Sequence, residues 1–188
     1  MKDLSSYAFS PLRTGDLTLY RGSGGGLSPI LLVAAENSSR ACLTQLEHEY
    51  ALRADLDAVW AAQPIELSRH RNRLALVLED PGGAVLDRLL GRPLGITEFL
   101  RIGIFLTAAL RQVHARGIIH KDIKPANILV DVATGGVWLT GFGIASRLPR
   151  ERPSPEPPGA IAGTLAYMAP EQTGRMNRSI DCLAGRWE

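Results

Sequence analysis

Lysine is scarce in this 188-residue chain, and cysteine, net charge and long hydrophobic runs are sparse as well. The only lysines are Lys2, Lys121 and Lys124, so arginine carries most of the positive charge. The two cysteines, Cys42 and Cys182, lie far apart and form no CxxC pair. This excludes a disulfide framework and a zinc knuckle, and it favours a reducing compartment.

The charge and hydropathy patterns give no sign of a nucleic-acid or membrane partner. A formal net charge of +2 is too small to favour binding to either surface. The longest apolar run, Ile102–Leu110, is too short to span a membrane. Residues 1–16 lack the apolar segment of a signal peptide. We therefore expect a cytoplasmic protein.

The first third of the chain predicts a small antiparallel sheet with one helix. With 45% hydrophobic residues, the chain can build one domain with a core. The basic cluster 69–73 is predicted to be a solvated turn between two strand-like runs. The glycine run 22–26 is predicted to be a flexible connector. Strands are predicted at 17–21, 30–35 and 74–78, and a helix over 43–56 with Leu43, Leu46, Tyr50 and Val59 on one face.

The middle of the chain is predicted to be mainly helical. Thr97 is a suitable N-cap for a long helix that ends at Gly117. After it the pattern changes to a β-hairpin formed by 128–130 and 137–139. Residues 149–158 contain five prolines, which predicts an extended loop. A short helix is predicted at 85–90, and the long helix carries Leu100, Ile104, Ala108, Arg111 and His114 along its length.

The segment His120–Asn127, between the long helix and the hairpin, carries the chemistry. Asp122 can accept the proton of an incoming hydroxyl and orient it for attack, and Lys124 can neutralise charge on a transferred phosphoryl group. Asn127, five residues after Asp122, can offer its carbonyl oxygen to Mg²⁺. His120 is the residue of this segment whose side chain is predicted to pack in the interior and support the loop.

Two further motifs follow in order, Gly141-Phe142-Gly143 and GTLAYMAPE at 163–171. Together with 120–127 they resemble the catalytic loop, metal-binding tripeptide and activation segment of eukaryotic-type Ser/Thr protein kinases. The HxDxxxxN pattern alone also occurs in small-molecule phosphotransferases, but these lack the APE segment. The resemblance implies an α+β, bilobal fold with a small N-lobe over residues 1–80 and an incomplete, mostly helical C-lobe over 81–188.

The resemblance also implies ATP and Mg²⁺ as cofactors and assigns roles to single residues. Considered without the family pattern, Glu49 is as typical of a solvated charge on a helix as of a functional residue, and Leu129 is as typical of a core residue. Catalytic roles fall to Asp122, Lys124, Asn127 and Thr164, whose hydroxyl would bridge Asp122 and Lys124. Asn127 would bind the metal, and Glu79, Leu129 and Gly15 would contact ATP. Structural roles fall to His120, Phe142, Glu49 and Glu171.

Four departures from the family pattern fall on the nucleotide side. The strand 30–35 has no lysine to hold phosphates and pair with Glu49. Gly141 replaces the metal-binding aspartate and has no oxygen to offer; each such loss typically lowers the rate by about 10²–10³. The phosphate loop is predicted at 13–16, with one glycine, rather than at the glycine run. In the hinge, Pro81 lacks the N–H that adenine requires if Leu78 is the gatekeeper.

The sequence APEQTGRMNRSID at 169–181 resembles one narrower group within this kinase family. These are large bacterial proteins that begin with a kinase-like domain and continue into AAA-type ATPase and sensor histidine kinase modules. The tail 182–188 does not resemble the family's next stretch, so we expect a truncation or frame change after Asp181. The long helix and activation segment would then expose apolar faces, and Glu171 would lack an arginine partner.

Three functions remain open from the sequence. The first is a kinase-like regulatory or binding module for a protein partner, with weak or absent phosphotransfer. The second is an active ATP-dependent Ser/Thr kinase, and the third a non-functional truncated fragment. Ser154, before Pro155, could in addition be a phosphorylation site that pairs with Lys121, or simply a serine in a proline-rich loop.

Overall fold

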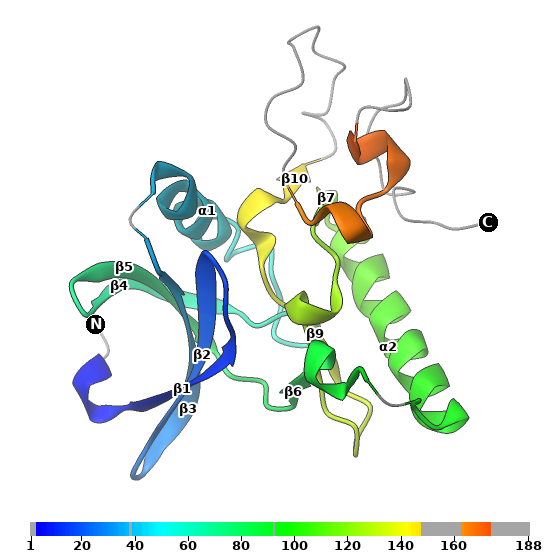
Figure 1. Ribbon diagram of the computed structural model, residues 1–188, viewed down its shortest axis with the longest axis horizontal. Coiled ribbons are helices and arrows are strands. Elements are labelled where there is room, and N and C mark those ends of the chain that lie inside the picture. The colour runs from blue at the N-terminus through cyan, green and yellow to red at the C-terminus, as the bar shows by residue number, and fades with distance from the viewer. Residues whose placement is uncertain (1–2, 38, 92, 148–162, 174–188) are drawn as a thin grey trace, which may run out of the picture.

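The computed structural model describes residues 3–37, 39–91, 93–147 and 163–173. The chain forms a five-stranded sheet with one helix, followed by a second part built from a long helix and short β-ladders (Figure 1). The strands of the first part are β1 (Ala8–Arg13), β2 (Leu17–Gly24), β3 (Leu27–Ala35), β4 (Pro64–His70) and β5 (Arg73–Glu79), and its helix is α1 (Arg40–Ala51). This is the small antiparallel sheet and single helix expected from the sequence.

The five strands are antiparallel and follow the order β1-β2-β3-β5-β4. The central strand β3 is buried from Ile30 to Ala35, as its continuous apolar run predicts. The basic cluster forms the tight β4–β5 turn, where Arg71 and Asn72 adopt positive φ angles. The predicted strands are therefore present, although each is longer than its apolar run because exposed residues continue the ladder.

The glycine run does not form one flexible connector. Gly22 and Gly24 lie inside β2, and only Gly25 and Gly26 form the turn to β3. Gly22 is required by packing, since a Cβ there would approach the Phe9 ring to 2.7 Å. Sequence composition alone could not separate a glycine that turns the chain from one that admits a neighbouring ring.

Helix α1 begins earlier and ends earlier than predicted, at 40–51 rather than 43–56. Ser39 caps it by accepting a hydrogen bond from the Cys42 N–H at 3.2 Å. Val59, predicted on the buried face, lies outside the helix and is 80% exposed, which makes that prediction wrong. Trp60 turns inward in its place, because the chain leaves the helix at Leu52 and changes direction.

The second part contains the long helix α2 (Ile96–Ala115). Its N-cap is Gly95 and not Thr97, because the Gly95 carbonyl already accepts the Phe99 N–H. Gly117, with φ +67°, follows the C-cap residue Arg116. Short elements complete this part: β6 (Ala84–Val85), β7 (Ile118–Ile119), β8 (Ile128–Val130), β9 (Val137–Leu139) and β10 (Ser146–Arg147), with 3-10 turns η2 (Leu86–Leu89), η3 (Pro125–Asn127), η4 (Phe142–Ile144), η6 (Leu165–Tyr167) and η7 (Pro170–Thr173).

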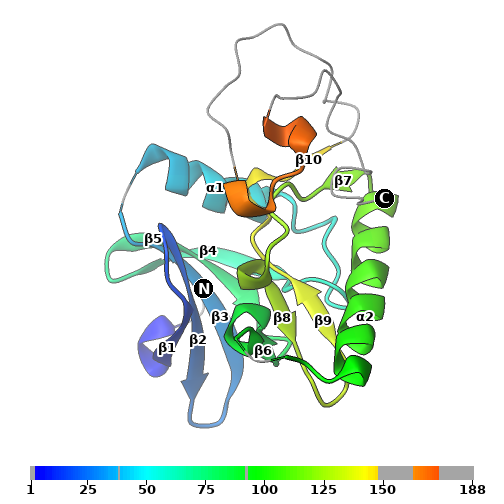
Figure 2. The same ribbon diagram turned by 45° about the vertical axis from the view of Figure 1, so that its right-hand side comes forward.

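Strands β8 and β9 form the predicted hairpin, and β6 pairs with the other edge of β8. The short helix predicted at 85–90 is wrong in part: Val85 belongs to strand β6, and only Leu86–Leu89 is helical, as the 3-10 turn η2. Figure 2 shows this small ladder lying between the five-stranded sheet and α2. Within the described residues, no helix is both long and apolar enough to cross a membrane.

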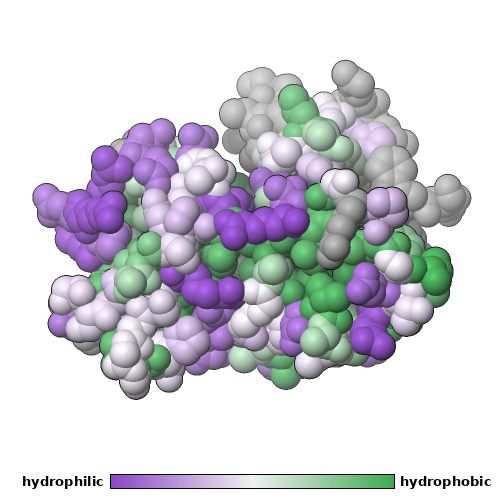
Figure 3. Space-filling view, turned by 60° about the horizontal axis from the view of Figure 1, so that its bottom comes forward, coloured by the Kyte–Doolittle hydropathy of each residue, from purple (hydrophilic) through white to green (hydrophobic). Residues whose placement is uncertain are grey.

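Helix α2 buries only one side. Its inward residues are Ile102, Ala109 and Val113, whereas Leu100 and Ile104 are 53% and 68% exposed. Hydrophobic surface gathers on the half of the molecule that carries α2, while the sheet half is more hydrophilic (Figure 3). The exposed apolar face predicted for the long helix is therefore present.

We expect replacement of both Leu100 and Ile104 by glutamine to reduce aggregation and binding of a hydrophobic dye. The free energy of unfolding should change by only about 0.5 kcal/mol, since these side chains are exposed. As a control, Ile102→Ala on the buried side should lower it by about 2 kcal/mol or more. Light scattering and urea denaturation measure the two effects. Equal destabilisation by both changes would contradict an uncovered face.

Candidate active site

A cavity of about 600 Å³ lies where the β1–β2 turn faces the segment 120–127. The turn consists of Thr14, Gly15 and Asp16, so the predicted phosphate loop borders the cavity and the glycine run does not. From α1 the cavity receives Gln45 and Glu49, and from β3 it receives Val33. Its floor is formed by Asp122, Lys124, Ala126, Asn127, Gly141 and Thr164.

The segment 120–127 is held from below by His120, which is 2% exposed. Its Nδ1 accepts the Asp122 N–H at 3.2 Å, and its Nε2–H donates to the Thr140 carbonyl at 3.0 Å. The ring lies 4.5 Å from the Phe142 ring, centroid to centroid, so the two residues assigned structural roles pack together. Burial lowers the pKa of His120 to about 4, so the ring stays neutral at pH 7.

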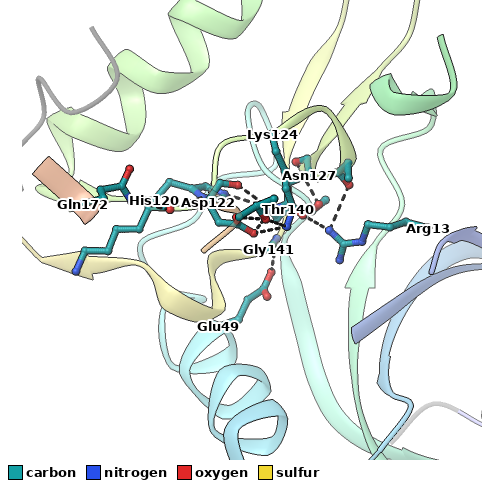
Figure 4. Close-up of polar contacts among 12 residues, drawn as sticks. Arg13, Glu49, His120, Asp122, Lys124, Asn127, Thr140, Gly141 and Gln172 are labelled. Carbon is teal, nitrogen blue, oxygen red and sulfur yellow. Dashed lines mark hydrogen bonds and ion pairs between the residues drawn. The ribbon is translucent and has the colours of Figure 1, made fainter. Parts of the chain in front are cut away.

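Asp122 lies at the centre of a polar network (Figure 4). Its Oδ2 is 2.8 Å from the Lys124 ammonium and accepts the Asn127 amide at 2.8 Å. Thr164 donates its hydroxyl to Asp122 Oδ1 at 3.0 Å and accepts from Lys124 at 2.6 Å. The threonine hydroxyl thus bridges aspartate and lysine as the resemblance implied, and it joins the activation segment to the loop.

The network keeps Asp122 ionised. Burial alone would raise its pKa, but the Lys124 ammonium and the bonds from Asn127 and Thr164 outweigh burial and lower the pKa. A carboxylate in this position can accept a proton from a hydroxyl brought to the cavity. This half of the site has the groups that phosphoryl transfer requires.

The part of the cavity on the nucleotide side differs from the family pattern. Glu49 is 1% exposed, which rules out a solvated helix charge, and its carboxylate accepts the Gly141 N–H at 3.1 Å. Burial raises its pKa, opposed by the Phe142 and Gly141 N–H groups and by the charge of Arg13. Val33 is the β3 residue that lines the cavity, so an isopropyl group stands where a phosphate-binding ammonium would be needed.

The residues do not fit a magnesium ion. Gly141 has no side chain to offer, and the Oδ1 of Asn127 accepts a hydrogen bond from the Arg13 guanidinium. The Asn127 amide nitrogen is directed at Asp122. No three acidic, histidine or cysteine side chains in the described residues come together as a metal site. Since Mg²⁺ in proteins is usually held by one or two carboxylates, the single amide oxygen of Asn127 is inadequate.

In the hinge, residues 79–82, backbone N–H groups also form hydrogen bonds within the protein. Pro81 lacks an N–H, and the N–H of Gly82 donates to Asp80 Oδ1 at 2.9 Å. Asp80 is held in turn by Arg21, whose Nε and Nη2 lie 2.6 and 2.9 Å from the carboxylate oxygens. The N–H of Glu79 donates to the Gln63 carbonyl. The N–H groups of Glu79 and Gly82 are therefore used within the protein.

Two residues assigned to ATP by resemblance are not brought to the cavity. Glu79 is exposed at the end of β5, and Leu129 is 1% exposed within a cluster that includes Leu12, Leu78 and Val85. Neither lines the cavity, whereas Gly15 does.

The activation segment is described from Gly163 to Thr173. Gln172 fastens it to the loop by donating to the Lys121 carbonyl at 2.9 Å. Glu171 lies in η7, but the surroundings of its side chain, and hence its predicted lack of an arginine partner, lie outside the described residues. The proline-rich stretch with Ser154 and the tail 182–188 also lie outside them.

The order and geometry of these motifs agree with the comparison of the chain with known proteins. The profile of the protein kinase domain matches residues 33–183. The chain belongs to the protein kinase family. This kinase domain is 37% identical over 109 residues to the serine/threonine-protein kinase Pkn1 of Myxococcus xanthus, covering 56% of the chain and 15% of that protein.

Two eukaryotic relatives match a longer part of this kinase domain. It is 35% identical over 146 residues to the Citron rho-interacting kinase of Rattus norvegicus, covering 72% of the chain and 7% of the relative. It is 34% identical over 135 residues to CBL-interacting protein kinase 4 of Oryza sativa, covering 70% and 27%. The matches thus span only a small share of these relatives' own lengths.

The sequence interpretation missed two residues of this kinase domain's cleft. It established that β3 has no lysine, but not that Val33 is the residue that faces the cavity. It named Arg13 only as part of the loop 13–16 and did not place its side chain beside Asn127. The signal for Arg13 was weak, because only the pairing of β1 with β2 determines which way its side chain turns.

Proposed function

We propose that this kinase domain acts as a Ser/Thr kinase-like regulatory or binding module and transfers phosphate weakly or not at all. The observation that carries the proposal is the content of the cleft. Val33 and Gly141 supply neither a cation nor a carboxylate, and a guanidinium contacts the amide oxygen of Asn127. Two missing electrostatic groups would together reduce turnover to about background.

The test is incorporation of radiolabelled phosphate from ATP into a generic basic protein, with Mg²⁺ present. We expect the chain to give no more incorporation than its Asp122→Asn variant, which keeps the size of the side chain but removes the proton acceptor. Incorporation well above background that disappears in Asp122→Asn would establish an active kinase and refute the proposal.

An active kinase is the second candidate, and one observation favours it. The Asp122–Lys124–Thr164 triangle has hydrogen-bonding distances throughout, so the phosphoryl-transfer half is assembled without a ligand. The same triangle also joins the activation segment to the loop. Its presence is therefore explained by a structural role as well, and the incorporation assay separates the two.

We infer further that the module serves a protein partner in the cytoplasm, and that its lobes divide at residues 80/81. The amino-acid sequence of residues 169–181 supports a parent protein with AAA-type ATPase and sensor histidine kinase modules. Sequencing the DNA beyond the present reading frame tests this, since a continuing kinase-like frame would reveal the longer protein. Such a frame would also explain the uncovered face of α2 better than a non-functional fragment does.

A further inference from the structure

The strand β1 ends in an arginine that turns into the cleft. The β1–β2 register shifts between Pro11 and Arg13, an irregularity typical of a β-bulge. Bulges commonly redirect a side chain next to an active site. Figure 4 shows Arg13 extending from the strand towards Asn127. The side chain therefore crosses from the sheet to the catalytic loop.

The guanidinium is only partly used by the protein. Its Nη1 donates to the Ala126 carbonyl at 3.2 Å and to the Asn127 amide oxygen. Its Nε is buried and has no hydrogen-bond partner among the described residues. Buried donors are nearly always paired, so the unpaired Nε shows that the hydrogen-bonding capacity of this guanidinium is not fully used within the protein, although Arg13 lines the cavity. Arginine is suited to this role because its donors form a planar fork that matches phosphate.

Two carboxylates, those of Glu49 and Asp122, lie near Arg13, and β3 contributes no positively charged side chain to the cavity. Burial lowers the pKa of Arg13, while the charges of Glu49 and Asp122 act in the opposite direction. Lys124 is already engaged by Asp122 and Thr164. Val33 offers only an apolar surface. A guanidinium thus lies beside Asn127, where the family pattern calls for a metal ion.

We propose that Arg13 takes the place of the metal beside Asn127, and that the cleft binds the polyphosphate of a nucleotide through this guanidinium without a divalent cation. The proposal rests on the proposed function, because it assigns a ligand to the same cleft. It differs in what it requires: binding without metal, whether or not phosphate is transferred.

The chemistry follows from charge. A triphosphate brings several negative oxygens, and the guanidinium of Arg13, which lines the cavity, can donate to one of them. A divalent cation at Asn127 would lie against the guanidinium, and like charges in a shielded site repel strongly. Added Mg²⁺ should therefore weaken nucleotide binding here, by chelating free ATP and by competing with Arg13.

The experiment is calorimetric titration of the full chain with ATP, and separately with inorganic tripolyphosphate, in EDTA and then in excess Mg²⁺. We expect binding of both probes in EDTA and weaker binding in Mg²⁺. Arg13→Gln should weaken binding in EDTA by about tenfold or more, the effect of removing a charged hydrogen bond. Arg69→Gln, in the exposed β4–β5 turn, should have no effect.

Absence of binding in EDTA, a requirement for Mg²⁺, or unchanged affinity in Arg13→Gln would each overturn the proposal. If Arg13→Gln does not fold, Arg13→Lys provides the test: it keeps the charge but not the fork, so tripolyphosphate should bind more weakly than to wild type, and equal affinity would refute the role. Failure of metal-free binding leaves the phosphate-incorporation result untouched, so the two hypotheses are tested separately.

Discussion

Replacement of Asp122 by alanine is expected to lower the free energy of unfolding by about 3 kcal/mol at neutral pH. The change removes the acceptor of Lys124, Asn127 and Thr164 and leaves a partly buried ammonium without its partner. Breaking such a pair costs more than the pair itself contributes, because the remaining charge stays desolvated. Urea denaturation followed by tryptophan fluorescence measures the loss.

The matched control for Asp122 is Asp57→Ala. Asp57 pairs with Arg116 at the surface, where both side chains are more than 40% exposed, so its loss should cost no more than about 1 kcal/mol. Equal stability of Asp122→Ala and wild type would show that the network does not brace the domain. The loop would then need a chemical explanation, which favours the active kinase.

The contribution of Asp122 should also depend on pH in a definite direction. Its pKa in the folded chain is lower than in the unfolded chain, so folding favours the carboxylate. The stabilisation is therefore present above the unfolded pKa and is lost as the pH falls through the folded pKa. The Asp122→Ala variant should approach wild-type stability in strong acid.

Acidification from pH 7 to pH 4 is expected to destabilise the domain by up to about 3 kcal/mol through His120 alone. Its pKa of about 4 in the folded chain lies below the value of 6.5 usual for histidine. Folding thus favours the neutral ring, and stability is fully present above pH 6.5 and lost as the pH falls towards 4. The slope approaches about 1.4 kcal/mol per pH unit.

The physical reason is the position of the added proton. Nδ1 already accepts the Asp122 N–H, so protonation there would remove a bond to the catalytic loop and bury a charge against Phe142. Urea denaturation at several pH values measures the slope. His120→Phe should be less stable at pH 7 but flatter with pH, because the ring packing remains while the titrating group is lost.

His70→Gln is the control for this slope. His70 packs against Phe9 at the edge of the sheet, and its pKa is lowered by burial and by Arg71. It is far less enclosed than His120, so most of the acid sensitivity should persist in this variant. A slope that disappears with His70 and remains with His120→Phe would show that the acid-sensitive group lies in the sheet.

Some sequence interpretations failed because local patterns compete. Thr97 resembles an N-cap, but the N-cap is Gly95, two residues earlier. Val59 continues the apolar spacing of α1, yet the chain has left the helix eight residues before it. Periodicity locates elements well, but their ends depend on single backbone hydrogen bonds that tertiary packing selects.

By itself, the sequence determined the family, the order of the motifs and the losses at the nucleotide side. A strand without lysine and a tripeptide without aspartate are facts of composition, and no folding can restore those groups. The catalytic-loop spacing was equally decisive, because Asp122 and Asn127 are joined by a short segment whose hydrogen bonds are local.

Only the tertiary structure decided what replaces the lost groups. Residues distant in sequence converge in the cleft: Arg13 reaches Asn127, Glu49 reaches the Gly141 amide, and Val33 faces the cavity. For Arg13 and Val33 the reason is that strand register and a bulge set the direction of the side chain, and a shift of one residue would turn it to the other face. Glu49 is directed by the packing of α1 beside the segment that follows β9.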